Sequence, residues 1–537
     1  MGRVLVIALD GYEISLAEKL MSSGHLPALA ALREESARFS LDHGLAKLTG
    51  LAAEHVSSGL SPEQSGRSSA VYFDRHTYQV WQEGTLLPPF PSKLKAKTIV
   101  FDLSYFDLKK APNVRGICAW GAHDAGIDFM CSPESLSREL LEKFGPYPGT
   151  EWIYGFAWPA AERCQAMGDA LTAGADLRSK VAHWLLKDRF SDWELGMIGV
   201  SEAHSVLEGL WHGTDEQHPL HRHPSSSAAG NGIRNVYAAI DRLIGDLATA
   251  FADATMVVFS MHGMGANQSD VASMVLLPEL LCRHVLGQSV LLQQESWDGA
   301  EDGIPMLGEH EGWEVETREL RSLARQISDY AAALIPAPLR NRFRWGSAGQ
   351  IDGADRPRKK SLQWIPGARY QPLWHKMAAF ALPSFYDGRI RINLQGRERH
   401  GIVPLEKYES VCQELETILA ECRDPATGEQ VFDRIKYNGG DNPRRLSPWA
   451  ADLEVIWKGA SLAFEHPMLG RIGPIPYRRT GGHTGPRGMA YLKGKGITPG
   501  DFGTRSSFDV VPTLLDLLGE RPALKVSGRS LLPTGSV

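Results

Sequence analysis

The chain has few cysteines and no long apolar run for its length. Its six cysteines among 537 residues are scattered, without a CxxC pair or a regular spacing, so neither a zinc knuckle nor a disulfide framework is indicated. No stretch of about 18 uncharged apolar residues occurs, which argues against a transmembrane helix. The amino-terminal residues enter an apolar run at once, unlike a secretory signal. These features favour a cytoplasmic protein with reduced cysteines.

Charge of one sign is also lacking. The formal net charge is -6, from 57 basic and 63 acidic residues. This balance supplies no basic field that would attract nucleic acid or an anionic membrane. Hydrophobic residues make up 43% of the chain and charged residues 22%, as in ordinary globular proteins. We therefore expect neither nucleic acid polymers nor membranes as partners.

Three apolar runs end on polar residues. The stretch Val257–Met264 reads VVFSMHGM, so His262 follows an apolar run, and Gly2–Gly11 reads GRVLVIALDG, with Asp10 in the same kind of place. Leu195–Val200 repeats the pattern. Such runs are typical of buried parallel strands, and open α/β sheets bind ligands at the carboxyl ends of their strands. We therefore expect Asp10 and His262, both metal-type ligands, to share one site.

Segments with helical spacing lie between and after these strands. Ile14–Arg38 predicts two helices, broken near Gly24 and Pro27. Further helices are expected at Ala170–Asp188, Asn235–Phe251, Leu405–Cys422 and Phe508–Leu518, and a further strand at Thr98–Asp102. The alternation predicts an α/β fold with a doubly wound, mostly parallel sheet.

The composition changes between about residues 290 and 370. Acidic stretches such as GEHEGWEVE give way to passages rich in proline, arginine and tryptophan. A long stretch of this kind fits poorly into a packed sheet. We therefore predict an inserted lid or cap at 291–370, flanked by two parts of one α/β core at 1–290 and 371–537.

Several polar residues are candidates for chemistry on position alone. Thr49 precedes a helix-like run, Leu51–Val56, where backbone N–H groups attract anions, although a plain N-cap threonine has the same pattern. His204, Glu208 and His212 are spaced four apart. On a helix they share one face and can chelate a cation, or they form a solvated face. His483 lies between glycines in TGGHTGPRG, either as a ligand or as a solvated loop histidine.

Five ordered blocks resemble the alkaline phosphatase superfamily, more closely its type I phosphodiesterase/nucleotide pyrophosphatase branch. The likeness runs along nearly the whole chain. The blocks are ALDG at Ala8–Gly11, Thr49 with SSGLSPEQSG at Ser57–Gly66, SMHGM at Ser260–Met264, INLQGRERHGIV at Ile392–Val403, and GGHTGPRG with PTLLDLLG at Pro512–Gly519. The resemblance implies an alkaline phosphatase-like fold with inserted cap or lid segments.

The resemblance also implies a mechanism. The family uses two metal ions, commonly zinc, and a threonine or serine nucleophile. Carried over by position, Thr49 is the nucleophile and a metal ligand, Asp10 and His262 hold the metal beside it, and His483 belongs to the other metal. A bound metal lowers the pKa of a hydroxyl, and a covalent phospho-threonine divides the displacement into two steps.

The sequence departs from the family pattern at two places. Met261 stands where the family has aspartate before the histidine of SDHGM, and a thioether is a poor ligand for a hard or borderline cation. The family pattern Asp-x-x-x-His is reversed here to His204-x-x-x-Glu208. Together with His483, these two residues make a set suited to zinc, manganese or ferrous iron.

Three functions are compatible with these residues. The first is a metal-dependent hydrolase or transferase that acts on a small-molecule phosphate, phosphonate or sulfate ester through Thr49. The second is an enzyme with one metal and altered chemistry on the same scaffold. The third, suggested by Met261, is a non-catalytic relative.

Overall fold

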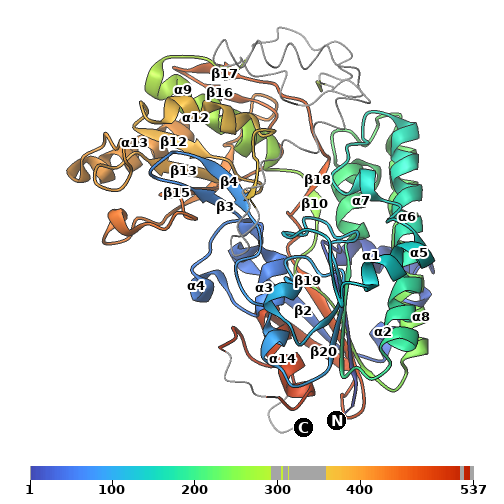
Figure 1. Ribbon diagram of the computed structural model, residues 1–537. Helices are drawn as coiled ribbons and strands as arrows, with labels where there is room; N and C mark the ends of the chain where they lie inside the picture. Colours follow the sequence, from blue (N-terminus) through green and yellow to red (C-terminus); the bar gives the residue numbers. More distant parts are fainter. Residues whose placement is uncertain (1, 292–303, 306–312, 314–358, 521–524, 533–537) are drawn as a thin grey trace. The chain divides into compact units, whose positions relative to one another are not determined.

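A computed structural model describes residues 2–291, 304–305, 313, 359–520 and 525–532 (Figure 1). The chain divides by its contacts into two compact units. Unit 1 comprises Met1–Ser68, Thr85–Asn267 and Arg479–Val537, and unit 2 comprises Ser69–Gly84 and Gln268–Arg478. The two units are described separately.

Unit 1 contains a nine-stranded sheet with the strand order β20-β2-β19-β9-β1-β8-β5-β6-β7. Its five central strands are mutually parallel: β9 (Thr255–Ser260), β1 (Val4–Leu9), β8 (Leu195–Val200), β5 (Thr98–Phe101) and β6 (Arg115–Cys118). The outer strands are β2 (Ala37–Asp42), β19 (Gly488–Lys493), β20 (Gly500–Ser506) and β7 (Met130–Ser132). Of these, β19 and β7 are antiparallel to their neighbours. The predicted mostly parallel sheet is confirmed.

Helices cover both faces of this sheet (Figure 1). Leu5, Ile7 and Leu9 of β1 belong to one core, which they share with residues of α1 (Ile14–Ser22), α2 (Pro27–Glu34), α6 (Ala161–His183) and α8 (Ser226–Ala250). Val4 and Val6 point to the other face and share a core with residues of α3 (Ala52–Ser58) and α14 (Val510–Leu517). Because successive side chains of a strand alternate between faces, apolar residues at every position of β1 bury both sides. The doubly wound fold is therefore confirmed.

Unit 2 has its own sheets and core. The four-stranded sheet has the order β12-β13-β15-β14, from β12 (Ala379–Leu382), β13 (Gly388–Ile392), β15 (Leu453–Trp457) and β14 (Phe432–Tyr437). A smaller sheet joins β11 (Lys359–Lys360), β4 (Val80–Glu83) and β3 (Val71–Phe73). The main helices are α9 (Leu277–Leu286) and α13 (Tyr408–Glu421).

The predicted domain division at residues 290 and 370 stays a prediction, and the two compact units have other boundaries. Of the segment 371–537, residues 479–537 belong to unit 1 and the residues before them to unit 2, because β12 to β15 pair with one another and not with the nine-stranded sheet. Most of the predicted lid at 291–370 lies outside the described residues. The lid stays a prediction.

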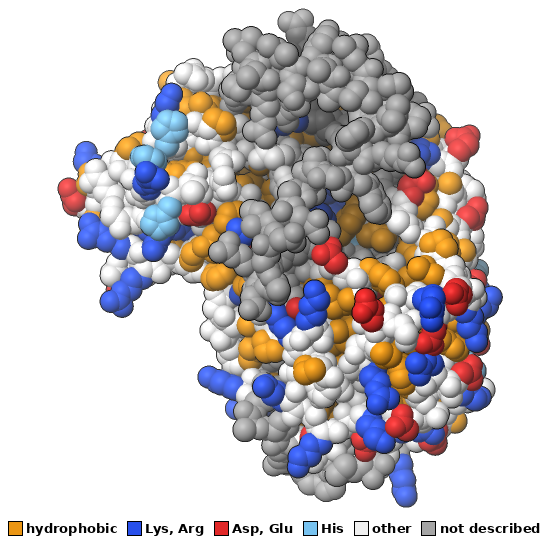
Figure 2. Space-filling model, viewed as in Figure 1, with side chains coloured by type: hydrophobic (Ala, Val, Ile, Leu, Met, Phe, Trp, Pro, Cys, Tyr) orange, Lys and Arg blue, Asp and Glu red, His pale blue; other side chains and the backbone are white. Residues whose placement is uncertain are grey.

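The structure also shows the distribution of surface charge and the state of the cysteines. On the described part of the face drawn in Figure 2, basic and acidic side chains are interspersed. Among the described helices, none combines the length and the apolar character that a bilayer crossing needs. All six cysteines are free, and five of them are buried.

Candidate metal centre

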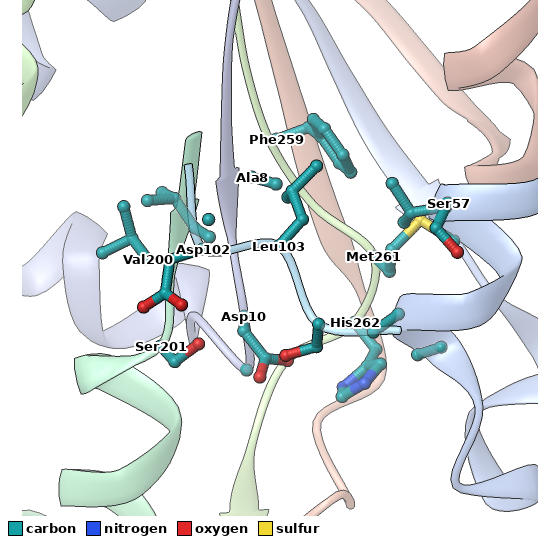
Figure 3. Close-up of a pocket in the computed structure, with 17 residues that line it drawn as sticks. Ala8, Asp10, Ser57, Asp102, Leu103, Val200, Ser201, Phe259, Met261 and His262 are labelled. Carbon is teal, nitrogen blue, oxygen red and sulfur yellow. The ribbon is translucent and has the colours of Figure 1, made fainter. Parts of the chain in front are cut away.

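The carboxyl ends of three parallel strands place the first polar residues. In the register of the sheet, Leu9 of β1 pairs with Val200 of β8, and Ala8 pairs with Phe259 of β9. The residues that follow these strands therefore emerge at one edge of the sheet, as open α/β sheets require for a ligand site. Asp10 and His262 line one cavity there, as expected (Figure 3).

Helix α7 (Glu202–Leu210), which follows β8, brings His204 and Glu208 to the same edge. The His204 Nδ1 atom lies 2.9 Å from Asp10 Oδ2, and its Nε2 atom lies 3.3 Å from Glu208 Oε1. His483 Nε2 lies 2.9 Å from His204 Nε2. The His262 and His483 rings have their centroids 4.6 Å apart. Five of the six residues predicted for the site are thus brought together.

Asp10 fixes the orientation of His204. Burial raises the pKa of Asp10, but the charge and hydrogen bond of His204 outweigh it, so the pKa is lowered. The ionised carboxylate accepts a hydrogen bond from Nδ1 of His204, so the ring is oriented with Nε2 towards Glu208 and His483. Gly11, the residue after Asp10, has φ +59°, and a Cβ atom at this position would lie 3.0 Å from His204 Cβ. Glycine thus allows this close approach.

The Nε2 lone pair of His204 faces acceptor-type atoms at the spacing of metal ligands. In a tetrahedral zinc site, ligand atoms about 2.0 Å from the ion lie roughly 3.3 Å from one another. The distances from His204 Nε2 to Glu208 Oε1 and to His483 Nε2 are 3.3 and 2.9 Å. These residues therefore fit a divalent cation.

His123 is a further candidate ligand that the sequence reasoning missed. It follows β6, and its ring stacks on His204 with the centroids 3.8 Å apart. Its Nδ1 atom lies 3.1 Å from Ser205 Oγ, and its Nε2 atom lies 3.7 Å from Glu208 Oε2. The ligand atoms of His123, His204 and Glu208 all lie within 4.8 Å of one another. A metal-binding histidine typically has its other ring nitrogen in a hydrogen bond, as Ser205 provides for Nδ1 of His123.

Arg479 is the second residue that was missed. It is buried, and its Nη1 donates a hydrogen bond to Glu208 Oε1. Burial lowers the pKa of Arg479 to about 9, so the side chain is still charged at neutral pH. Thr480 N–H donates to the carbonyl of Glu208 at 3.0 Å. At Gly481 an added Cβ atom would lie 2.0 Å from the carbonyl oxygen of Leu207, so only glycine lets this segment pack on α7.

Thr49 is the sixth residue predicted for the site. It ends the short 3-10 helix η1 (Gly44–Thr49), and its hydroxyl donates to Ala46 O at 2.8 Å and accepts from Leu51 N–H at 3.1 Å. Among the described residues, its hydrogen bonds thus remain within its own segment. The N-cap of α3 is Leu51, so Thr49 is not a plain N-cap threonine. Its role as nucleophile stays a prediction.

Met261 lines an apolar cavity beside Asp10 (Figure 3). The cavity measures about 50 Å³, and Leu103, Val200 and Phe259 contribute to its wall. Residues of α3, the helix that follows Thr49, line it as well. The position that carries aspartate in the family pattern thus presents a thioether, and the donors left for a cation next to Thr49 are Asp10 and His262.

His212 does not join the site. Helix α7 ends at Leu210, and His212 lies in a 3-10 turn, so the four-residue spacing no longer aligns it with Glu208. Its Nδ1 lies 3.2 Å from Thr480 Oγ1, and its Nε2 lies 3.0 Å from Ser225 Oγ. His212 thereby contacts the segment that carries His483.

Burial keeps two of the site histidines neutral. It is the largest cause that lowers the pKa of His262 to about 4 and the pKa of His483 well below its usual value. Neutral imidazole is the form that binds a metal ion. These two rings are therefore available as ligands at neutral pH.

Buried histidines outside the site predict a loss of stability in acid. Burial is the main cause that lowers the pKa of His55 and of His212 to about 3, against about 6.5 when unfolded. Between these values the unfolded state binds more protons, so the free energy of unfolding falls as the pH falls from about 6.5 towards 3. Each histidine contributes a slope of up to about 1.4 kcal/mol per pH unit.

Urea denaturation at several pH values, with a chelator present, tests this expectation. The variant His55→Gln should have a slope lower by about 1.4 kcal/mol per pH unit than the unsubstituted protein. The exposed His76 provides the control, since His76→Gln should leave the slope unchanged. Equal slopes in all three proteins would contradict the prediction.

A mostly parallel, doubly wound sheet with histidines and carboxylates clustered at its strand ends defines an α/β protein with a site suited to a divalent cation. A sequence model of the type I phosphodiesterase / nucleotide pyrophosphatase family matches residues 4–295, more than half of the chain. The chain belongs to this family. It is therefore an enzyme of the phosphoester-hydrolysing class, and members of the family are metallohydrolases.

Solved structures share the fold at low identity. Phosphonoacetate hydrolase from Sinorhizobium meliloti 1021 is similar both with phosphonoacetate, at a TM-score of 0.51, and with phosphonoformate, at 0.50; both comparisons give 11% identity and cover 96% of this chain and 95% of the other. Murine ectonucleotide pyrophosphatase / phosphodiesterase 5 in complex with AMP gives a TM-score of 0.47 and 11% identity, and covers 98% and 97%. No curated protein sequence matched the chain.

Proposed function

We propose that the protein is a metal-dependent hydrolase of small-molecule phosphoesters or phosphonates, with a divalent cation held by His204, Glu208 and His483 and assisted by His123. The observation that carries this proposal is the arrangement around His204. Asp10 holds its Nδ1, and its Nε2 faces Glu208 Oε1 and His483 Nε2 at 3.3 and 2.9 Å. Three nitrogen donors and one carboxylate favour zinc, with manganese or ferrous iron as alternatives.

The residues of the chain have separate tasks in this proposal. A cation bound at the site supplies positive charge to the phosphoryl oxygens. For an ester, the Thr49 hydroxyl oxygen forms a bond to phosphorus while the bond from phosphorus to the ester oxygen breaks, and the hydroxyl proton leaves with the alcohol. For a phosphonate, the bond from phosphorus to carbon breaks instead, and the carbon takes up the proton. Water then hydrolyses the phospho-threonine. Asp10 and Ser205 keep the imidazoles of His204 and His123 oriented throughout.

The second candidate is an enzyme that binds one metal ion where the family pattern has two, and Met261 favours it. Asp10 is engaged with His204, and the thioether of Met261 lies in the apolar cavity beside it. The donors that remain for a metal next to Thr49 are His262 and Asp10, and the Asp10 carboxylate already accepts a hydrogen bond from His204. We therefore propose one tightly held cation.

Metal content measured alongside a substrate panel tests the function. The purified protein is treated with a chelator, reloaded with zinc, manganese or ferrous iron, and assayed on chromogenic phosphate monoesters, phosphate diesters, phosphonates and sulfates. We expect turnover of a phosphorus ester that disappears with the chelator and returns with one of the metals. A protein that binds no metal and turns over no ester would be the non-catalytic relative.

Substitution of Met261 tests the number of metals. We expect the unsubstituted protein to retain about one equivalent of metal after gel filtration. Met261→Asp restores the carboxylate of the family pattern, so its metal content should rise towards about two equivalents. Met261→Leu, which keeps the apolar side chain, is the matched control and should stay at one. Two equivalents in the unsubstituted protein would contradict the one-metal proposal.

A further inference from the structure

Two cationic side chains reach the histidine cluster from different segments of unit 1. Lys47 lies in η1, two residues before Thr49, and its Nζ donates to the carbonyl of Gly485 at 3.2 Å. Arg479 lies on the other side of His483 in the sequence and donates to Glu208 Oε1. The loop that carries His483 is therefore held between a lysine and an arginine.

Both charges act on the cluster. Gly485, which accepts the hydrogen bond from Lys47, lies two residues after His483, and the Glu208 oxygen that accepts the hydrogen bond from Arg479 lies 3.3 Å from His204 Nε2. The two cations thus lie within electrostatic reach of the rings that face the proposed metal position. Both charges therefore favour an anion at that position.

Arg479 and the proposed cation would share one acceptor oxygen. Glu208 Oε1 is the atom that both Arg479 and the Nε2 side of His204 face. A divalent cation held by His204 and Glu208 takes up this oxygen, so it competes with the guanidinium for it. The guanidinium has five N–H donors in a planar fork that matches the oxygens of phosphate. Its donors then turn to an anion bound at the cation.

We propose that Lys47 and Arg479, together with the bound cation, form a cradle for a terminal phosphoryl or phosphonyl group with three non-bridging oxygens. This inference rests on the proposed function and names its substrate class. A phosphate monoester or a phosphonate presents one such oxygen to each of the three cationic partners. A phosphodiester has two non-bridging oxygens and one negative charge, so it leaves one partner without an acceptor. The structure thus favours doubly charged substrates over diesters.

Calorimetry on the metal-loaded protein tests the cradle without requiring turnover. Inorganic phosphate at about pH 8 is the doubly charged probe, and dimethyl phosphate is the singly charged diester probe. We expect inorganic phosphate to bind about tenfold or more tightly than dimethyl phosphate. Equal binding of the two anions, or no binding of inorganic phosphate, overturns the proposal.

Substitutions assign the preference to the two residues. Arg479→Met and Lys47→Met should each weaken inorganic phosphate about tenfold and change dimethyl phosphate much less. Arg479→Lys, which keeps a charge opposite Glu208, should lie in between and carries the test if Arg479→Met does not fold. Arg487→Met is the matched control, because Arg487 lies on the same loop but is exposed and paired with Asp42. Unchanged phosphate binding in folded Arg479 and Lys47 variants overturns the assignment.

Metal affinity gives an independent readout. If Arg479 competes with the cation for Glu208, Arg479→Met should bind zinc several times more tightly, by about threefold or more. Weaker zinc binding in a folded Arg479→Met protein contradicts the competition. If the protein binds phosphate as expected but hydrolyses no ester, the cradle is supported and the hydrolase proposal is contradicted. The failures of the two proposals are therefore distinguishable.

Discussion

Replacing Thr49 with alanine is expected to lower the turnover of the best ester substrate by about a thousandfold or more. The proposed nucleophile is then absent, whereas the cation site formed by α7 and the His483 loop is untouched. Within the described part of the chain, the Thr49 hydroxyl bonds with Ala46 and Leu51 of its own segment, so the free energy of unfolding should change by about 1 kcal/mol. Steady-state kinetics, metal content and thermal unfolding measure the three quantities.

Two control variants make this test specific. Thr49→Ser keeps a hydroxyl nucleophile and should retain a large part of the activity. Thr172→Ala removes another threonine hydroxyl that bonds to a backbone carbonyl, here that of Gly168 in α6, and should leave turnover unchanged. A Thr49→Ala protein with the activity of the unsubstituted one would remove Thr49 from the mechanism while leaving the metal proposal standing.

Replacing His204 with alanine should weaken metal binding by about a thousandfold and abolish turnover, because His204 contacts Asp10, Glu208 and His483. Asp10→Asn keeps the ring in place but weakens its orienting hydrogen bond. We therefore expect the smaller loss of about ten- to hundredfold that is typical of residues behind a metal ligand. Competition with a chromogenic chelator measures both affinities.

The graded order of these two losses is the discriminating result. His25→Ala, at an exposed position, serves as the control and should bind metal normally. If Asp10→Asn weakens binding as much as His204→Ala, Asp10 is itself a ligand, and the one-metal arrangement is wrong. If neither variant loses metal, the cation is held elsewhere.

The fold could be predicted because its signals are local. The apolar runs of β1, β8 and β9 are visible in the sequence, and the observed strands end at Leu9, Val200 and Ser260. Asp10 follows the first strand directly, and His262 comes two residues after the third. Parallel pairing then brings Asp10 and His262 to one edge without further information.

The rest of the site could not be predicted because its signals are not local. His123 is a single histidine in the stretch AWGAHDAG, without a spacing that indicates a metal, and only the fold of the loop after β6 stacks it on His204. Arg479 is one of two successive arginines, and nothing in the sequence shows that it is the buried one that meets Glu208. Both contacts depend on the packing of segments far apart in the chain.

The position of β19 has a consequence for synthesis of the protein. This strand lies between β9 and β2 and comes directly after the loop with Arg479 and His483. During translation, β1, β8 and β9 are therefore synthesised long before β19, which pairs with the other edge of β9. Until residues 488–493 emerge, β9 and β2 present bare edges, which are prone to pair with other chains. Chaperone dependence during translation should therefore end late, when the carboxyl-terminal segment inserts.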